Sequence, residues 1–267
     1  MELLRRSVRG VIGYNSPIYR AASEFLNFAT VVANEGPGMW RKLRDLKEAS
    51  GSYSKGSPAV PVKLRKLQHP IMLRPGTEDA STVVHTIVRE EYGDFVPSKE
   101  PMVMIDAGAY IGDTSAYFLS RFKSLKIVAL EPSRETYEAA KANLALYGDR
   151  VSLLNKGLAA TTGKIRFSGN TTAASISDSG EQEIDCISIL DVMATNNFDR
   201  IDILKMDIEG AETEIFRTDI DKWLPLVDNV LIELHGPECE QVVLGALRAA
   251  NFDIRQHRSV YYCSRVK

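Results

Sequence analysis

The sequence contains no apolar run that approaches the roughly 20 residues needed to cross a bilayer. Its first nine residues are basic, but the stretch that follows is interrupted by Asn15, Pro17 and Arg20, so it lacks the apolar segment of a secretory signal. Only three cysteines are present, far apart and without the spacing of a metal site, which argues against a disulfide framework. These absences predict a cytoplasmic protein with reduced thiols.

Neither sign of charge is in large excess, since the formal net charge is −2, but the distribution is uneven. Residues 1–66 hold 12 Lys and Arg against 5 Asp and Glu, whereas the rest of the chain holds 21 against 30. A basic N-terminal segment on an acidic body suggests contact with a membrane surface, an acidic glycan or a second subunit of a homodimer. A solvated helical face explains the same residues equally well. The acidic body argues against nucleic acid as a partner.

Composition and periodicity divide the chain into three regions, 1–58, 59–100 and 101–267. The first region predicts two helices, 17–33 and 37–47, and ends in a linker rich in Ser, Gly and Pro. The second predicts a hairpin with strands at 62–67 and 71–73, followed by a helix that runs through Glu91.

The third region alternates strands with helices, which is typical of a parallel α/β sheet with helices on both faces. Strands are expected at 102–105, 125–130, 151–154, 201–206 and 229–234. Helices are expected at 116–122, 134–146, from the 207–212 segment to Trp223, and at 238–250. Short extra strands at 164–167 and 183–187 flank a Ser/Thr-rich stretch, and residues 252–256 and 260–264 predict a closing antiparallel hairpin.

The segment Met102–Ser115 has the pattern of a strand, a tight turn and a helix start. Asp106 ends the strand, and Gly108 and Gly112 follow it. Glycine lets a backbone approach a ligand closely, and free N–H groups at a helix start favour polar or anionic ligand atoms. The spacing D-x-G-x-x-x-G differs from the G-x-G-x-x-G of nicotinamide and flavin binders, which argues against the alternative of a nicotinamide-dependent oxidoreductase.

An acid ends the next strand of this region. Glu131 comes 25 residues after Asp106, and an acid at that strand tip can accept hydrogen bonds from both hydroxyls of a ribose. A dinucleotide or an adenosyl cofactor explains it equally well, and a solvated loop acid is the alternative. Combined with the glycine turn, Glu131 favours nucleoside binding.

Polar residues end one predicted strand after another, namely Asp106, Glu131, Asn155, Asp207, Glu209 and His235. Because ligands of open α/β sheets bind beyond the carboxyl ends of the strands, this edge is the expected site. Lys205 lies inside an apolar strand, where a buried ammonium needs an acid partner. Its role is either to position or activate substrate, or to form a structural ion pair.

The segments IDAGAYIGDTS, ALEPSRETYEAAKANLALYG, DILKMDIEGAETEIF and VLIELHG resemble the FkbM-type S-adenosylmethionine-dependent methyltransferases. The resemblance runs from about Met102 to the C-terminus, and K-x-D-x-E-G-A-E at Lys205–Glu212 is its most specific part. It implies a class I methyltransferase fold, a Rossmann-like, mostly parallel seven-stranded sheet closed by an antiparallel hairpin. It also implies O-methylation, commonly of sugar or polyketide hydroxyls, with S-adenosyl-L-homocysteine as the second product.

The resemblance assigns roles to individual residues. It implies a cofactor loop at Asp106, Gly108, Ala109, Tyr110 and Gly112. It implies ribose and adenine contacts at Glu131, Pro132, Ser133, Asn155, Lys156 and Gly157. The acceptor would meet the cofactor's sulfonium at Asp207, Glu209 and His235.

The chemistry of O-methylation agrees with these residue types. An aliphatic hydroxyl is a poor nucleophile, so a base that removes its proton assists the transfer. His235 is the expected base, because histidine has an ordinary pKa of about 6.5. Asp207 or Glu209 would orient it or take the proton themselves, with Lys205 as a further candidate.

Three alternatives remain beside this hypothesis. The carboxylates could hold a divalent cation, although the sequence offers no dedicated set of metal ligands. A non-catalytic scaffold that binds the cofactor and docks through its basic arm is a second alternative. Nucleic-acid methylation is the third, and the absence of an N-P-P-Y-type motif for a flipped base argues against it.

Overall fold

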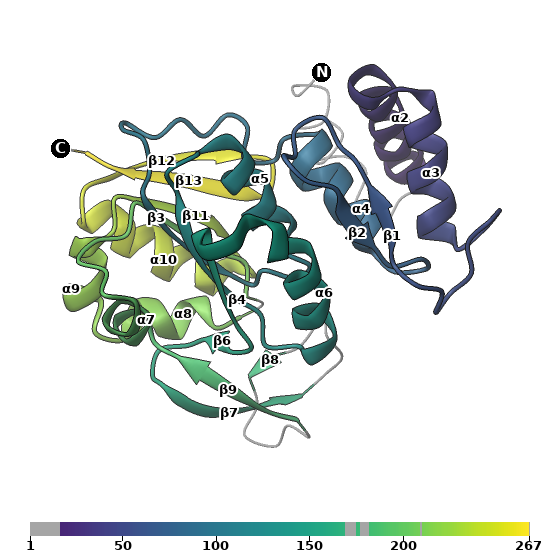
Figure 1. Cartoon of the computed structure of the whole chain (residues 1–267). Helices are drawn as coiled ribbons and strands as arrows, with labels where there is room; N and C mark the ends of the chain where they lie inside the picture. The colour runs from purple at the N-terminus through teal and green to yellow at the C-terminus, as the bar shows by residue number, and fades with distance from the viewer. Residues whose placement is uncertain (1–16, 169–174, 177–181, 209, 267) are drawn as a thin grey trace.

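The computed structural model describes residues 17–168, 175–176, 182–208 and 210–266. At its centre is a seven-stranded sheet with the order β12-β13-β11-β10-β3-β4-β5 (Figure 1). The parallel strands are β3 (Val103–Ala107), β4 (Lys126–Leu130), β5 (Val151–Leu154), β10 (Ile203–Met206) and β11 (Asn229–Glu233). The antiparallel hairpin β12 (Phe252–His257) and β13 (Val260–Arg265) closes the sheet. The predicted fold class is therefore confirmed.

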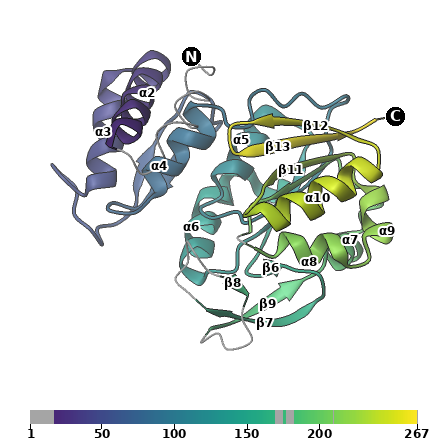
Figure 2. The same cartoon turned by 180° about the vertical axis from the view of Figure 1, so that it is seen from behind.

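Helices cover both faces of this sheet, because its strands are apolar on both sides. Side chains alternate along a strand, so Met104 and Ile127 join the core on one face while Ile105 and Val128 join the core on the other. The first face carries α5 (Asp113–Arg121), α6 (Arg134–Leu144) and the 3₁₀ turn η2 (Ala145–Arg150). The opposite face carries α7 (Ile189–Asn196), α8 (Glu212–Arg217), α9 (Ile220–Trp223), η3 (Leu224–Leu226) and α10 (Pro237–Ala249) (Figure 2).

A second, smaller sheet lies beyond β5 and was only partly predicted. Its order is β6 (Gly157–Leu158), β9 (Gln182–Ile187), β7 (Gly163–Ser168) and β8 (Ser175–Ile176). The short strands at 164–167 and 183–187 were expected, but their pairing with Gly157–Leu158 was not. Helix α7 was also missed. It begins after Ser188, whose hydroxyl accepts a hydrogen bond from the backbone N–H of Asp191 at 3.1 Å.

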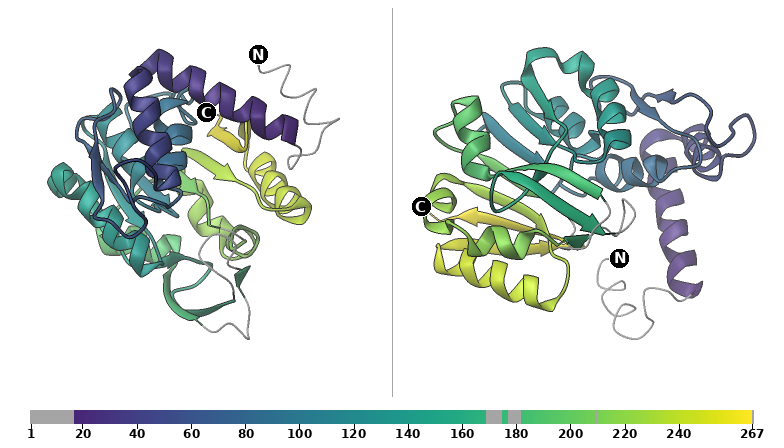
Figure 3. Two further views of the ribbon diagram at one scale, coloured as in Figure 1. Left: turned by 90° about the vertical axis from the view of Figure 1, so that its right-hand side faces the viewer. Right: turned by 90° about the horizontal axis from the view of Figure 1, so that it is seen from below.

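The N-terminal part consists of α2 (Pro17–Glu35), α3 (Pro37–Glu48), the hairpin β1 (Val60–Val62) and β2 (Ile71–Leu73), α4 (Asp79–Val83) and the π-helix η1 (Val84–Val88). Both predicted helices are present, and α2 packs against α3 and η1 and projects from the body (Figure 3). Val31, Leu43 and Leu46 are buried in the same core as Phe118 of α5. One hydrophobic core thus crosses both region boundaries that the sequence indicates.

Three predicted elements were wrong in extent. The first strand of the hairpin ends at Val62, because Leu64 and Leu67 are buried within a turn, not along a strand. The helix expected to run through Glu91 ends three residues earlier, as the π-helix η1. The helix expected to reach Trp223 is split into α8 and α9, because Asp219 adopts a left-handed conformation with φ of 49°.

The described part of the chain has no helix with both the length and the apolar character that spanning a membrane requires. Its three cysteines are buried and unpaired.

Candidate active site

Two glycines are dictated by the geometry of the turn between β3 and α5. Gly108 and Gly112 have φ of 78° and 79°, in the left-handed region that favours glycine. A Cβ on Gly108 would lie 1.9 Å from the carbonyl oxygen of Asp207, and one on Gly112 would lie 2.9 Å from the side chain of Leu144. Tyr110 between them also has a positive φ, of 50°. At Gly108 the turn therefore packs backbone against backbone at the end of β10, which only glycine permits.

Glu131 follows β4 and is held by three donors around this turn. Its Oε2 accepts a hydrogen bond from the backbone N–H of Tyr110 at 2.8 Å. Its Oε1 accepts from the N–H of Ser133 at 2.9 Å and from the hydroxyl of Thr136 at 2.7 Å. Burial raises the pKa of Glu131, and these hydrogen bonds oppose the rise. Since a carboxylate offers about four acceptor positions, Glu131 is fixed in place and still able to accept from a ligand hydroxyl.

Lys205 forms a buried ion pair with Asp106 on the neighbouring strand, where the parallel register sets the two residues side by side. The Lys205 Nζ lies 3.3 Å from Oδ1 of Asp106 and donates to the carbonyl oxygens of Gly108 at 2.7 Å and Ala107 at 3.3 Å. The other carboxylate oxygen of Asp106 accepts from the hydroxyl of Ser115 at 2.6 Å. Burial lowers the pKa of Lys205, but Asp106 and nearby carboxylates outweigh it, so the pKa is raised. The ion pair that the sequence allowed is thus present, and it braces the glycine turn.

A cavity of about 410 Å³ opens at the carboxyl ends of β3, β4, β10 and β11. Six residues that the sequence indicates line it, namely Gly108, Tyr110, Glu131, Ser133, Lys205 and Asp207. The π-helix η1 contributes His85 and Thr86, so the N-terminal part closes one side of the cavity. A second cavity, of about 270 Å³, lies beside α7 and Trp223 and touches none of these residues.

Other residues that the sequence indicates do not line this cavity: Asp106, Ala109, Gly112, Pro132, Asn155, Lys156, Gly157 and His235. Asn155 stabilises the backbone that carries Glu131, because its Nδ2 donates to the carbonyl oxygens of Glu131 and Pro132, each at 2.9 Å. Gly157 is buried in the second sheet. Glu209 lies outside the described residues.

His235 follows β11 and is oriented by Glu212, the last residue of the K-x-D-x-E-G-A-E motif, to which the sequence assigned no role. The Nδ1 of His235 lies 2.9 Å from Oε1 of Glu212, whose side chain is fully buried. The other oxygen of Glu212 accepts from the N–H of Gly210 at 2.7 Å. The Nε2 of His235 faces Asp207, with 3.9 Å to Oδ1. Asp207, which lines the cavity, thus lies next to the imidazole, and Glu212 fixes its far side.

The cavity is acidic to a degree that the sequence did not predict. Glu91, Asp113 and Glu233 line it together with Asp207. Burial and the neighbouring carboxylates raise the pKa of Glu91 to about 7, and burial raises the pKa of Asp113 to about 6. Burial and Asp207 likewise raise the pKa of Glu233. The sequence contains features that could have predicted two of these cavity residues, since Asp113 directly follows the second glycine and Glu233 lies on the same strand face as His235. No feature of the sequence indicates that Glu91 lines the cavity.

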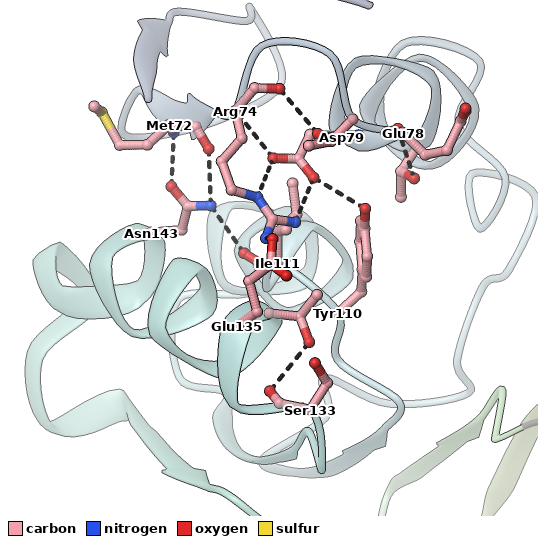
Figure 4. A network of polar contacts seen from close by, with 12 residues as sticks. Met72, Arg74, Glu78, Asp79, Tyr110, Ile111, Ser133, Glu135 and Asn143 are labelled. Atoms are coloured by element: carbon pink, nitrogen blue, oxygen red, sulfur yellow. Dashed lines mark hydrogen bonds and ion pairs between the residues drawn. The ribbon is translucent and has the colours of Figure 1, made fainter. Parts of the chain in front are cut away.

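The N-terminal part is clamped to the glycine turn by polar contacts (Figure 4). Asp79 accepts hydrogen bonds from the Nε of Arg74 at 2.9 Å, from its Nη2 at 2.8 Å and from the hydroxyl of Tyr110 at 3.0 Å. Asn143 of α6 accepts from the N–H of Met72 at 2.6 Å and donates to the carbonyl oxygen of Ile111 at 2.9 Å. Burial raises the pKa of Asp79, but the hydrogen bonds from Arg74 outweigh it and the pKa is lowered. These contacts hold Tyr110 against α4.

The sheet order, the closing hairpin, the glycine turn and the acid at the tip of β4 together define a class I methyltransferase fold. The sequence profile of the methyltransferase FkbM domain matches residues 106–259. The chain belongs to this family, which confirms the resemblance seen in the sequence, and it is a methyltransferase.

Several characterised or solved proteins are similar to the chain. Methyltransferase sdnD of Sordaria araneosa is 28% identical over 196 residues, which cover 58% of this chain and 75% of that protein. The hexuronic acid methyltransferase AglP of Haloferax volcanii is 28% identical over 143 residues, covering 52% and 58% respectively. The crystal structure of methyltransferase FkbM from Methylobacillus flagellatus KT has 19% identity and a TM-score of 0.47. That match covers 63% of this chain and 45% of that one, so the chain spans less than half of it.

Proposed function

We propose that the protein is an S-adenosylmethionine-dependent O-methyltransferase that acts on a hydroxyl of a sugar or glycoconjugate. The observation that carries this proposal is the pairing of the glycine turn with the fixed carboxylate of Glu131 at one cavity. The glycine turn and the Glu131 carboxylate, which can still accept hydrogen bonds, meet at the cavity, and this is the arrangement that an adenosyl group requires.

The residues present fit this cofactor. Glu131 would accept hydrogen bonds from the ribose hydroxyls, with Tyr110 and Ser133 beside it. The buried Oδ2 of Asp113 has no hydrogen-bond partner within the described chain, so it offers an acceptor to a cationic group in the cavity. When bound, the cofactor supplies a methyl group on a positively charged sulfur, a good leaving group that needs alignment more than activation.

The residues around His235 suit proton removal from an acceptor hydroxyl. A carboxylate accepts hydrogen bonds, so Glu212 favours the tautomer with the proton on Nδ1, and Nε2, which faces Asp207, is the nitrogen that would take a proton. The hydroxyl proton would pass to Nε2, while Asp207 between the imidazole and the cavity would orient the hydroxyl. Among the described residues no group of three or more His, Cys, Asp or Glu is arranged to hold a metal ion, so the proposal rests on His235.

The carbohydrate acceptor is supported by one relative, whose name states that it methylates a hexuronic acid. The other relative is named only as a methyltransferase, so a hydroxyl on another class of small molecule is compatible with it.

Cofactor binding tests the proposal directly. A ligand that binds only the folded state raises the melting temperature, so S-adenosylmethionine should raise it and NAD should not. Glu131→Ala should weaken the affinity for S-adenosylmethionine by about tenfold or more, because two hydrogen bonds to a charged group are lost. Glu138→Ala on the exposed side of α6 is the matched control and should leave the affinity unchanged. Tighter binding of NAD than of S-adenosylmethionine, or an unchanged affinity in Glu131→Ala, would refute the proposal.

A further inference from the structure

We infer that α2 and α3 form a docking surface for an anionic phospholipid membrane. Membrane docking goes beyond the proposed function and is independent of it. Among the side chains that the structure describes, only Phe25 and Phe28 are both aromatic and exposed, at 68% and 41%. Their ring centroids lie 6.4 Å apart, so they form one aromatic patch on α2. Exposed phenylalanine is costly in water and is stabilised when it enters the interface of a bilayer.

The aromatic patch lies on the outer side of α2. Phe25 and Phe28 are three residues apart, so they project from neighbouring positions on the helix. The other side holds α2 on the body, because Val31 is buried in the core and Oδ1 of Asn27 accepts a hydrogen bond from Nη1 of Arg89 at 2.9 Å. The helix projects from the body (Figure 3) and is not long and apolar enough to span a membrane. It is therefore suited to lie in a membrane surface.

Trp40 of α3 connects the aromatic patch with basic side chains. Its ring packs edge-on against that of Phe28, with 5.5 Å between the centroids. Tryptophan is favoured at the membrane–water interface, because its ring is apolar and its N–H is polar. Arg41 follows Trp40, Arg44 lies one turn further along α3, and both side chains are exposed. The two guanidinium groups contact the single carboxylate of Asp45, so this cluster keeps a net positive charge.

The distribution of charge favours a membrane as the partner. Residues 17–66 carry nine Lys and Arg against four Asp and Glu, whereas residues 67–267 carry 21 against 30. An anionic surface therefore attracts the part that contains α2 and α3 and repels the body, which turns the aromatic patch toward the lipid. A second copy of the chain fits this surface less well, because a symmetric dimer brings two parts of like charge together.

Vesicle binding tests the inference with the whole chain. Co-sedimentation compares vesicles of phosphatidylcholine with vesicles of equal parts phosphatidylcholine and phosphatidylserine. The protein should bind the anionic vesicles about tenfold or more tightly, and added salt should weaken this binding because it screens the charges. Absence of vesicle binding, or equal binding to both kinds of vesicle, would overturn the inference.

Tryptophan fluorescence shows whether the aromatic patch enters the lipid. The chain has two tryptophans, Trp40 beside the patch and Trp223, which is buried in the body. Brominated lipid in the anionic vesicles should quench the fluorescence of the wild type and not that of Trp40→Phe. Binding to the vesicles without this quenching would place the contact elsewhere on the molecule and overturn the inference.

Two variants with matched controls connect binding with this surface. Phe25→Ser should lower the affinity for anionic vesicles by about tenfold, since one phenylalanine no longer enters the lipid. Leu146→Ser removes a similarly exposed apolar side chain, at 63%, from η2 of the body and should keep the affinity. Arg44→Gln should lower the affinity at low salt by about fivefold. Lys222→Gln should not, although Lys222 also contacts a neighbouring aspartate.

All four substitutions replace exposed side chains, so each variant should keep the melting temperature of the wild type. An equal loss of vesicle binding in a variant and its control would overturn the inference. A dimer in sedimentation velocity that Phe25→Ser dissociates would assign the aromatic patch to a second copy of the chain and would overturn it as well.

Discussion

The Nδ1 of His235 lies 2.9 Å from Oε1 of Glu212, a carboxylate with no exposure to solvent. The contact joins the residues after β11 to the first turn of α8, two elements with only α9 and η3 between them in the chain. Because the N–H of Gly210 holds the other oxygen of Glu212, the carboxylate cannot rotate away. Glu212 is thus a positioning residue, which sets the ring orientation and tautomer of the proposed base.

The first prediction concerns the base itself. His235→Ala should lower the turnover rate by about 10² to 10⁴, the usual contribution of a general base. The affinity for the cofactor should stay within about twofold, because the proposed role of His235 is toward the acceptor hydroxyl and Glu131, not His235, is the proposed partner of the cofactor. Single-turnover kinetics with saturating cofactor would separate the two effects. Near-normal turnover in the variant would transfer the role of base to Asp207.

The second prediction concerns Glu212. Glu212→Gln keeps the size of the side chain but loses its charge and can present an N–H to Nδ1 of His235. That contact selects the tautomer with the proton on Nε2, so turnover should fall by about tenfold or more while the affinity for substrate changes little. Glu212→Asp, which keeps the charge, should recover part of the rate. If both variants lose the folded state equally by circular dichroism, the role of Glu212 is structural only.

The third prediction concerns the clamp between the N-terminal part and the glycine turn. Asp79→Asn breaks the ion pair with Arg74 and should lower the free energy of unfolding by about 3 kcal/mol. This value is at the lower end of the range for losing one partner of a buried ion pair, because Arg74 keeps its contact with Glu135. The pKa of Asp79 is lowered in the folded state, so its contribution is present above about pH 4 and is lost as the pH falls further. Urea unfolding from pH 7 to pH 3 should therefore show a difference between wild type and variant that shrinks in acid. A difference independent of pH would contradict this account.

The fourth prediction concerns Glu91. Its ionised carboxylate lowers the free energy of unfolding, whereas the ionised carboxylate of Asp79 raises it. The pKa of Glu91 rises from 4.5 to about 7 on folding, so the folded state disfavours the charged form. The resulting loss of stability is absent below about pH 4.5, grows up to about pH 7 and is constant above. Glu91→Gln should accordingly be more stable than wild type at pH 8, by about 1–3 kcal/mol, and equal to it at pH 4. A Glu91→Gln protein that is less stable at pH 8 would show that the carboxylate is paired within the protein.

The fifth prediction concerns residues 1–47. Their basic charge suggested an arm that docks on a membrane or forms a dimer, which no contact described here tests. The packing nevertheless predicts that their deletion lowers the melting temperature, because Val31, Leu43 and Leu46 leave the core. The deletion should also weaken cofactor binding, since Asn34 of α2 holds the carbonyl oxygen of Val88 in η1 at 3.1 Å. A truncated protein with unchanged stability would restore the idea of an independent arm.

The sequence alone determined the parallel sheet, the glycine turn and the acid at the tip of β4. These features follow from local patterns: short runs of apolar residues define the buried strands, and a pair of glycines or an acid at a strand end is visible in a few consecutive letters. The motifs also determined the family, because K-x-D-x-E-G-A-E and its partners are short and contiguous.

Only the tertiary structure decided which side chains face one another. Glu212 meets His235 because parallel strands β10 and β11 end at the same edge of the sheet, a relationship across 23 residues that no local pattern encodes. Glu91 joins Asp113 and Glu233 because the N-terminal part folds over that edge, which depends on packing of Val31 and Leu46 against the body. Local propensity acts over one turn or strand, whereas a cavity and its charge arise from segments that only the core brings together.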